Sequence, residues 1–131
     1  MSEEFDTGFL SVDISDAIEP KTVPQDTYQV QVLSAEVMEK HYVAMRLKIL
    51  DQENVKSVRC CVWYPKPEDD AEKVNRKKLG IQRVLNALGL DGSATSQPDS
   101  WVGATGWAVL KEVRSEEYGT QNEVANWIRP K

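Results

Sequence analysis

The feature that most constrains the fold is a strict alternation of apolar and polar side chains over residues 41–50, HYVAMRLKIL. Every second residue is apolar, and between them stand Tyr42, Ala44, Arg46 and Lys48. Because successive side chains of a strand point to opposite faces, the alternation predicts a strand with one face in the core. The other face carries an aromatic ring and two cations instead of the mixed charges of an ordinary solvated surface.

Five segments in all have the pattern of strands, and one has the pattern of a helix. The predicted strands cover residues 27–37, 41–50, 57–64, 101–113 and 121–130. The first changes phase at Leu33, which predicts a bulge. The third places Arg59, Cys61 and Trp63 on one face and apolar residues on the other.

Residues 67–90 predict the helix. Asp69 or Asp70 is placed to cap its start, and Gly89 stands where a left-handed residue ends a helix. Its predicted apolar stripe is Val74, Ile81, Val84, Leu85 and Leu88. We expect residues 91–100 to form a loop before the fourth strand.

The order of elements, three strands, a helix and two strands, predicts the fold class. A small sheet must protect its edges, and closing it into a barrel does so. This order is that of the oligonucleotide/oligosaccharide-binding barrel, the OB-fold. We therefore expect a mainly β protein, a five-stranded OB-fold barrel with one α-helix between the third and fourth strands.

The acidic residues are concentrated at the N-terminus. Residues 1–26 hold seven acidic side chains against Lys21 alone, and the rest of the chain holds 14 acids and 15 bases. The net charge of −5 therefore leaves room for a local basic surface on the body of the protein. We expect residues 1–25 to form an acidic leader, extended or partly disordered, and residues 26–131 to form the folded domain.

Catalytic and metal-binding signatures are missing from the sequence. His41 is the one histidine, and there is no Gly-x-Ser-x-Gly, P-loop or dinucleotide motif. Cys60 and Cys61 are adjacent in a predicted strand, so they point to opposite faces and are poorly placed for a disulfide. We expect a protein without catalytic activity, cofactor or metal site.

The expected setting is cytoplasmic, and in a host cell if the chain is encoded by a phage. The N-terminus lacks the basic and apolar regions of a secretory signal. No stretch approaches the roughly 20 apolar residues of a membrane helix, so no membrane partner is expected.

Several segments together resemble a family of small phage and prophage proteins encoded among replication and recombination genes. The resemblance rests on EPKTVPQDTYQVQVLSAEV, HYVAMRLKIL, the helix end NALGL, WVGATGWAVL and YGTQNEVANWI. That family is similar to single-stranded-DNA-binding proteins, so the resemblance implies an OB-fold and single-strand binding. One departure is that the acids lie at the N-terminus, whereas bacterial single-strand-binding proteins usually carry an acidic tail at the C-terminus.

The candidate binding residues follow from the face that residues 41–50 and 57–64 would share. Single strands are held by cations along the phosphates and by rings on which bases stack. The candidates on that face are Tyr42, Arg46, Lys48, Arg59 and Trp63. Lys111, Arg114 and Tyr118 are further candidates, expected at the strand ends and loops that frame the face. The alternative is that these side chains are merely solvated. We expect Trp107 and Trp127 to be core or interface residues, whereas Trp101 could be either.

Two further basic and aromatic features have open roles. The run from Asn75 to Lys78, with Arg83, gives the predicted helix a basic side, which we interpret as a solvated face in preference to a path for DNA. Phe5 and Phe9 lie in the acidic leader. They could compete with DNA for the binding face or dock a replication partner, or the leader could be a solubilising arm.

The candidate face and the resemblance together imply a protein that binds single-stranded DNA during phage replication or recombination, without strong sequence preference, with RNA not excluded. The alternative is a non-catalytic adaptor joining proteins of a replication or recombination complex. Homo-oligomers are compatible with either function.

Overall fold

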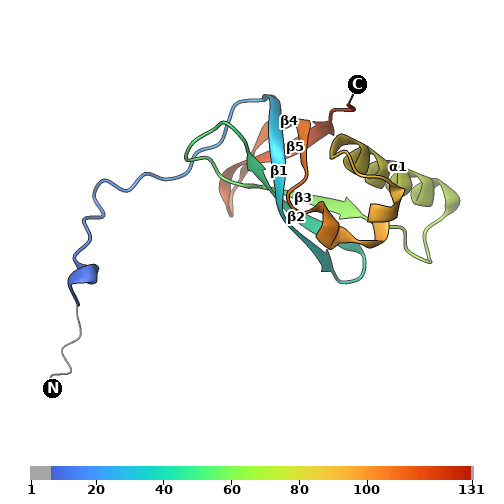
Figure 1. Cartoon of the computed structure of the whole chain (residues 1–131), viewed down its shortest axis with the longest axis horizontal. Coiled ribbons are helices and arrows are strands. Elements are labelled where there is room, and N and C mark those ends of the chain that lie inside the picture. The colour runs from blue at the N-terminus through green and yellow to red at the C-terminus, as the bar shows by residue number, and fades with distance from the viewer. Residues whose placement is uncertain (1–6, 131) are drawn as a thin grey trace, which may run out of the picture.

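Five antiparallel strands and one helix make up the fold (Figure 1). The computed structural model describes residues 7–130. The strands are β1 (Asp26–Met38), β2 (Tyr42–Ile49), β3 (Val58–Trp63), β4 (Thr105–Ser115) and β5 (Gly119–Trp127). The helix α1 (Ala71–Ala87) lies between β3 and β4, and the short 3-10 helices are η1 (Thr7–Leu10), η2 (Gly92–Ser96) and η3 (Pro98–Trp101). The predicted mainly β class and the position of the helix are confirmed.

The sheet order is β3-β2-β1-β4-β5, and hydrogen bonds do not close it into a barrel. This corrects the expected closed barrel. β3 and β5 do lie in contact, and α1 contacts both strands. However, a groove of about 490 Å³ lies between the facing parts of β3, β5 and α1, so their backbones form no ladder in the described part of the chain. Side chains meet across the seam instead: Trp127 on β5 lies beside the Cys60 thiol on β3.

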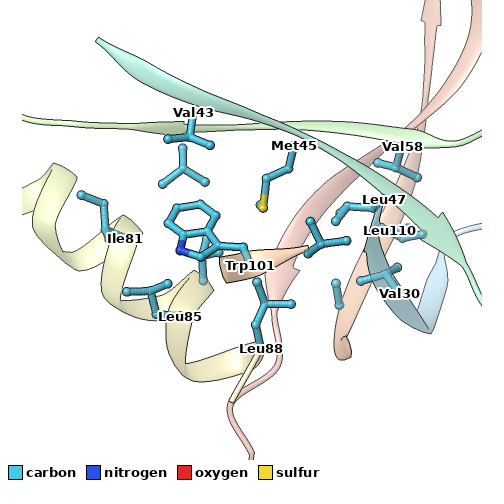
Figure 2. Packing of buried hydrophobic residues seen from close by; sticks show 14 of the residues in the cluster. Val30, Val43, Met45, Leu47, Val58, Ile81, Leu85, Leu88, Trp101 and Leu110 are labelled. Atoms are coloured by element: carbon cyan, nitrogen blue, oxygen red, sulfur yellow. The ribbon is translucent and has the colours of Figure 1, made fainter. Parts of the chain in front are cut away.

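The core lies between the inner face of the sheet and α1. The predicted apolar face of β2 is confirmed, since Val43, Met45, Leu47 and Ile49 are all buried. Trp101, from η3, is fully buried among residues from the sheet and α1 (Figure 2). Its indole nitrogen donates a hydrogen bond of 2.8 Å to the carbonyl oxygen of Ala94. Trp101 is thus a core residue, and residues 91–104 form two 3-10 turns around it, so β4 begins four residues later than expected.

The local sequence signals in β1 and α1 are confirmed. The register of β1 against β2 shifts between Val32 and Ser34, which is the predicted bulge at Leu33. Asp70 caps α1 by accepting a hydrogen bond of 2.8 Å from the backbone nitrogen of Lys73. Gly89 follows the helix with a φ of 72°, a conformation that glycine adopts at no steric cost.

Gly106 marks the closest approach of β4 to the helix. A Cβ atom built on it would lie 2.4 Å from the carbonyl oxygen of Ala87, the last residue of α1. Only a residue without a side chain fits there, which explains the glycine inside a strand.

The N-terminal segment leaves the body of the protein as an extended chain (Figure 1). Residues 8–21 are exposed. The segment joins the body at Lys21, whose backbone pairs with the loop between β2 and β3, and at Val23. Asn122 on β5 holds Val23 through two hydrogen bonds of 2.9 Å to its backbone. No helix in residues 7–130 is long and apolar enough to span a membrane.

Candidate nucleic-acid interface

The register between β2 and β3 brings most of the predicted binding residues onto one surface. Tyr42 is opposite Trp63, Ala44 is opposite Cys61, and Arg46 is opposite Arg59. Lys48 continues the same face of β2 and is opposite Gln31 on β1. We call this surface the β2–β3 face. Its members are Tyr42, Ala44, Arg46, Lys48, Arg59, Cys61 and Trp63.

Two aromatic rings lie together at one end of the β2–β3 face. The ring centroids of Tyr42 and Trp63 are 4.5 Å apart, and the ring planes make an angle of 38°. Trp63 is nevertheless 50% exposed, which is unusual for a large apolar side chain that already has an aromatic neighbour. The pair therefore offers an exposed aromatic surface on which a further planar group can stack.

Two arginines lie directly opposite each other in the middle of the same face. Arg46 and Arg59 are cross-strand partners, and both are exposed. Arg46 donates a hydrogen bond of 3.2 Å to the Ser57 hydroxyl, but within residues 7–130 neither arginine has a carboxylate within 4.0 Å. Like charges directly opposite one another destabilise a sheet. The arrangement thus has a cost in the free protein that a bound anion would remove.

The face is not uniformly basic. Glu36 on β1 is exposed and lies opposite Ala44, so it is on the outward side next to the ring pair. The opposite end of the face is positive, because Lys48 is exposed and no ion pair engages it among the described residues. An extended anion would therefore be held best along Lys48 and the two arginines, with its planar groups at Tyr42 and Trp63.

The remaining predicted binding residues lie elsewhere, on the β4–β5 hairpin. Lys111 is opposite Glu123, so its charge faces a carboxylate across the strands. Arg114 is exposed near the end of β4, and Tyr118 is exposed in the turn that follows. This hairpin is tied to the loop between β2 and β3 by a hydrogen bond of 2.9 Å from the Lys56 ammonium to the Thr120 carbonyl. These three residues frame the end of the molecule away from the ring pair.

Trp107 is a surface residue, although sequence reasoning placed it in the core or an interface. It is 50% exposed on the outward side of β4, opposite Gln29 on β1. The core alternative is therefore wrong for Trp107 and the interface alternative stays a prediction, whereas Trp127 does pack partly against the core. In the structure the small residues Gly106 and Ala108 on either side are buried, so the alternation of side chains in β4 places Trp107 on the outside. Sequence alone could not show which side of the strand is buried, because Trp107 and Val109 are as apolar as Gly106 and Ala108.

The two aromatic residues of the leader remain candidates. Phe9 is 73% exposed and makes no docking contact with the body that would confirm an autoinhibitory role. Phe5 lies outside the described residues.

The two cysteines occupy opposite sides of β3, as expected. Both are free thiols. Cys60 faces inward, and its burial raises the pKa of the thiol to about 11. Cys61 is only partly buried on the β2–β3 face. It is a natural reporter for whatever covers that face.

The comparisons with known proteins give no family. No protein-family model matches the sequence, and no curated protein matches it. Within residues 7–130, no group of three histidine, cysteine or acidic side chains converges as metal ligands would. The β2–β3 face is therefore the feature from which a function can be inferred.

Proposed function

We propose that this protein binds single-stranded DNA through the β2–β3 face, without strong sequence preference, during replication or recombination. The observation that carries the proposal is the pair of cross-strand arginines without carboxylate partners, beside the partly exposed ring pair of Tyr42 and Trp63. Phosphates satisfy the first and bases satisfy the second, and a single strand supplies both at regular spacing. The arginine pair has a cost in the free protein, and Trp63 is half exposed although its ring already has a neighbour.

The fold supports the same proposal. The sheet order β3-β2-β1-β4-β5, the helix between β3 and β4 and the contact of β3 with β5 support our assignment of a partly open OB-fold barrel. In that fold the face of the second and third strands is a usual site for oligonucleotides. The rings and arginines lie on those two strands.

A salt series tests the proposal. Quenching of tryptophan fluorescence by oligothymidine is measured for the wild type and for a Trp63→Ala, Arg46→Glu double variant. We expect the wild type to bind with log K falling by about 0.7 per log unit of salt for each phosphate neutralised. The double variant should lose most of this affinity, because it lacks a stacking ring and one of the paired cations.

The matched control is a Trp107→Ala, Lys78→Glu double variant. It removes an equally exposed tryptophan and reverses an exposed charge, both outside the β2–β3 face. If the two double variants bind with equal affinity, the site assignment is wrong. If the wild type does not bind at all, the proposed function is wrong.

A second candidate function is that of an adaptor in a replication or recombination complex. The observation in its favour is the leader, where Phe9, Leu10, Ile14 and Ile18 are all largely exposed. Exposed apolar side chains among acids are typical of segments that fold on a partner. Quantitative capture of a purified replication protein, lost when Phe9 and Ile14 are replaced by serine and unaffected by DNA, would favour this function over the first.

A further inference from the structure

The groove between β3, β5 and α1 is a second feature that the β2–β3 face does not use. We infer that it binds the continuation of the same polynucleotide strand, so that the DNA passes over the edge of β3 and along α1. This inference rests on the proposed function and deepens it. The groove has a volume of about 490 Å³, and the residues that matter in its lining are Trp63, Lys73, Arg76, Gly80, Arg83 and Trp127.

The groove is continuous with the β2–β3 face. Trp63 and Cys61 belong to that face and also line the groove, because they stand on the outermost strand of the sheet. A strand stacked on Trp63 therefore already lies at the entrance. Trp127, on β5, supplies an aromatic ring on the other wall.

The charge of the groove fits phosphates. Four cations of α1 line it, and two of them already have carboxylate partners. Lys77 is bound to Asp69 at 2.7 Å, and this hydrogen bond holds the pKa of the Asp69 carboxyl below its usual range. Lys73 and Arg83 have no carboxylate within 4.0 Å in the described part of the chain. These two side chains are exposed and free to hold an anion.

The fold does not explain why residue 80 is a glycine. It lies in the middle of α1, where glycine is about 1 kcal/mol less favourable than alanine. A Cβ atom at this position would have nothing within 4 Å, and its φ is not in the left-handed region, so neither packing nor backbone geometry requires a glycine. At Gly106, by contrast, the Ala87 carbonyl oxygen leaves no room for a side chain. At Gly80 the space next to the helix is open, and it lies in the groove.

A polynucleotide fits this groove better than a peptide does. A peptide that adds a strand to the open edge of β3 or β5 would be held by backbone hydrogen bonds and needs no cations. The groove instead combines two free cations with two tryptophans, which is the combination that single strands require. The basic side of the helix is therefore part of a binding path, contrary to its interpretation as a merely solvated face.

The test compares a short and a long oligothymidine, of about 5 and about 15 nucleotides, within the range of site sizes for one OB-fold. The groove variants are Gly80→Leu, which fills the groove without changing its charge, and Lys73→Gln with Arg83→Gln. We expect each to bind the long oligonucleotide about tenfold more weakly than the wild type does. The charge variant should also lower the slope of log K against log salt by about 1.4, because two phosphate contacts are lost. Binding of the short oligonucleotide should stay within about twofold, because the β2–β3 face is intact.

Two controls keep the result interpretable. Asn75→Leu adds the same side chain at an exposed position of α1 outside the groove, so it should keep its affinity for both oligonucleotides. Lys78→Gln removes a cation of the same helix that does not line the groove. If the groove variants match these controls on the long oligonucleotide, the inference is overturned while the proposed function stands. If the wild type binds neither oligonucleotide, both fail. Self-association that Gly80→Leu abolishes, with DNA binding unchanged, would overturn the inference and assign the groove to a second copy of the chain.

Discussion

Trp63 and Trp107 are exposed to the same extent on the outward side of one sheet, yet their surroundings differ. Trp63 packs against Tyr42 with its ring tilted, and it belongs to a face with three cations that have no carboxylate partner among the described residues. Trp107 is opposite Gln29 and next to the strand positions of Thr105 and Val109, which are uncharged. Exposure alone therefore does not identify a binding residue.

The two strands that carry these tryptophans also differ in what lies behind them. Behind Trp107, β4 approaches α1 so closely that Gly106 has no room for a side chain. Behind Trp63, β3 ends the sheet beside an open groove. The region behind β4 is thus closely packed against α1. The region behind β3 keeps an open groove that the core does not fill.

The largest expected effect is on stability and concerns the packed side. Gly106→Val would force a side chain against the Ala87 carbonyl oxygen, so we expect it to lower the free energy of unfolding by about 3 kcal/mol. Denaturant unfolding followed by circular dichroism measures the loss. Gly80→Ala is the control on the open side, and it should raise the free energy of unfolding by about 1 kcal/mol. Equal stability of Gly106→Val and the wild type would contradict the close approach of β4 to α1.

The next effect compares the two tryptophans directly in binding. Trp63→Ala should weaken binding to oligothymidine by about 1 to 3 kcal/mol, the value of one base stacked on an aromatic ring. Trp107→Ala should change it by less than about 0.5 kcal/mol, as a surface substitution outside the site does. Fluorescence anisotropy of a labelled oligonucleotide measures both without relying on the tryptophans. A larger loss for Trp107→Ala would reverse the comparison and move the site to β4.

The comparison also shows how far the sequence could predict this molecule. The alternation in residues 41–50 predicted which side of β2 is buried, and the register of β2 with β3 then placed Tyr42 beside Trp63. Such short-range patterns predict the orientation of side chains because one side of each strand must be buried. The sequence did not predict the opening between β3 and β5, since that depends on how the ends of a curled sheet meet around α1. Without knowledge of this opening, neither the groove nor the position of Gly80 in it could be inferred from the sequence.

A smaller effect has opposite signs for binding and stability. Arg59→Gln removes one of two like charges that are directly opposite, so the free protein should gain about 0.5 kcal/mol of stability. The same variant should lower the salt slope of oligothymidine binding by about 0.7, because one phosphate contact is lost. Thermal unfolding and a salt series measure the two quantities.

Lys111→Gln is the counterpart of that variant on the hairpin. Lys111 faces Glu123, so removing its charge should lower the stability slightly and leave the salt slope unchanged. If Arg59→Gln also destabilises the free protein, the two arginines do not lower its stability by repulsion. The main support for the binding site is then lost.

The last prediction uses the neighbouring cysteines to report which side of the sheet DNA covers. At pH 8 an alkylating reagent should label Cys61 and spare Cys60, because Cys60 packs against the core and its pKa of about 11 keeps it a neutral thiol at that pH. As the pH rises toward 11, Cys60 should begin to react, since only the thiolate is nucleophilic. Saturating oligothymidine should slow the labelling of Cys61 about tenfold, which mass spectrometry of the digested protein measures.

The β4 side provides the matching control for this labelling. In a Cys61→Ala background, Val109→Cys places a partly buried thiol on the same side of β4 as Trp107. DNA bound along the β2–β3 face leaves that thiol uncovered, so its labelling rate should not change. Protection of the introduced thiol, together with unaltered labelling of Cys61 in the parent protein, would place the DNA against Trp107. In that case Trp107 would be the binding residue, and the ring pair of Tyr42 and Trp63 would serve only to cover the edge of the sheet.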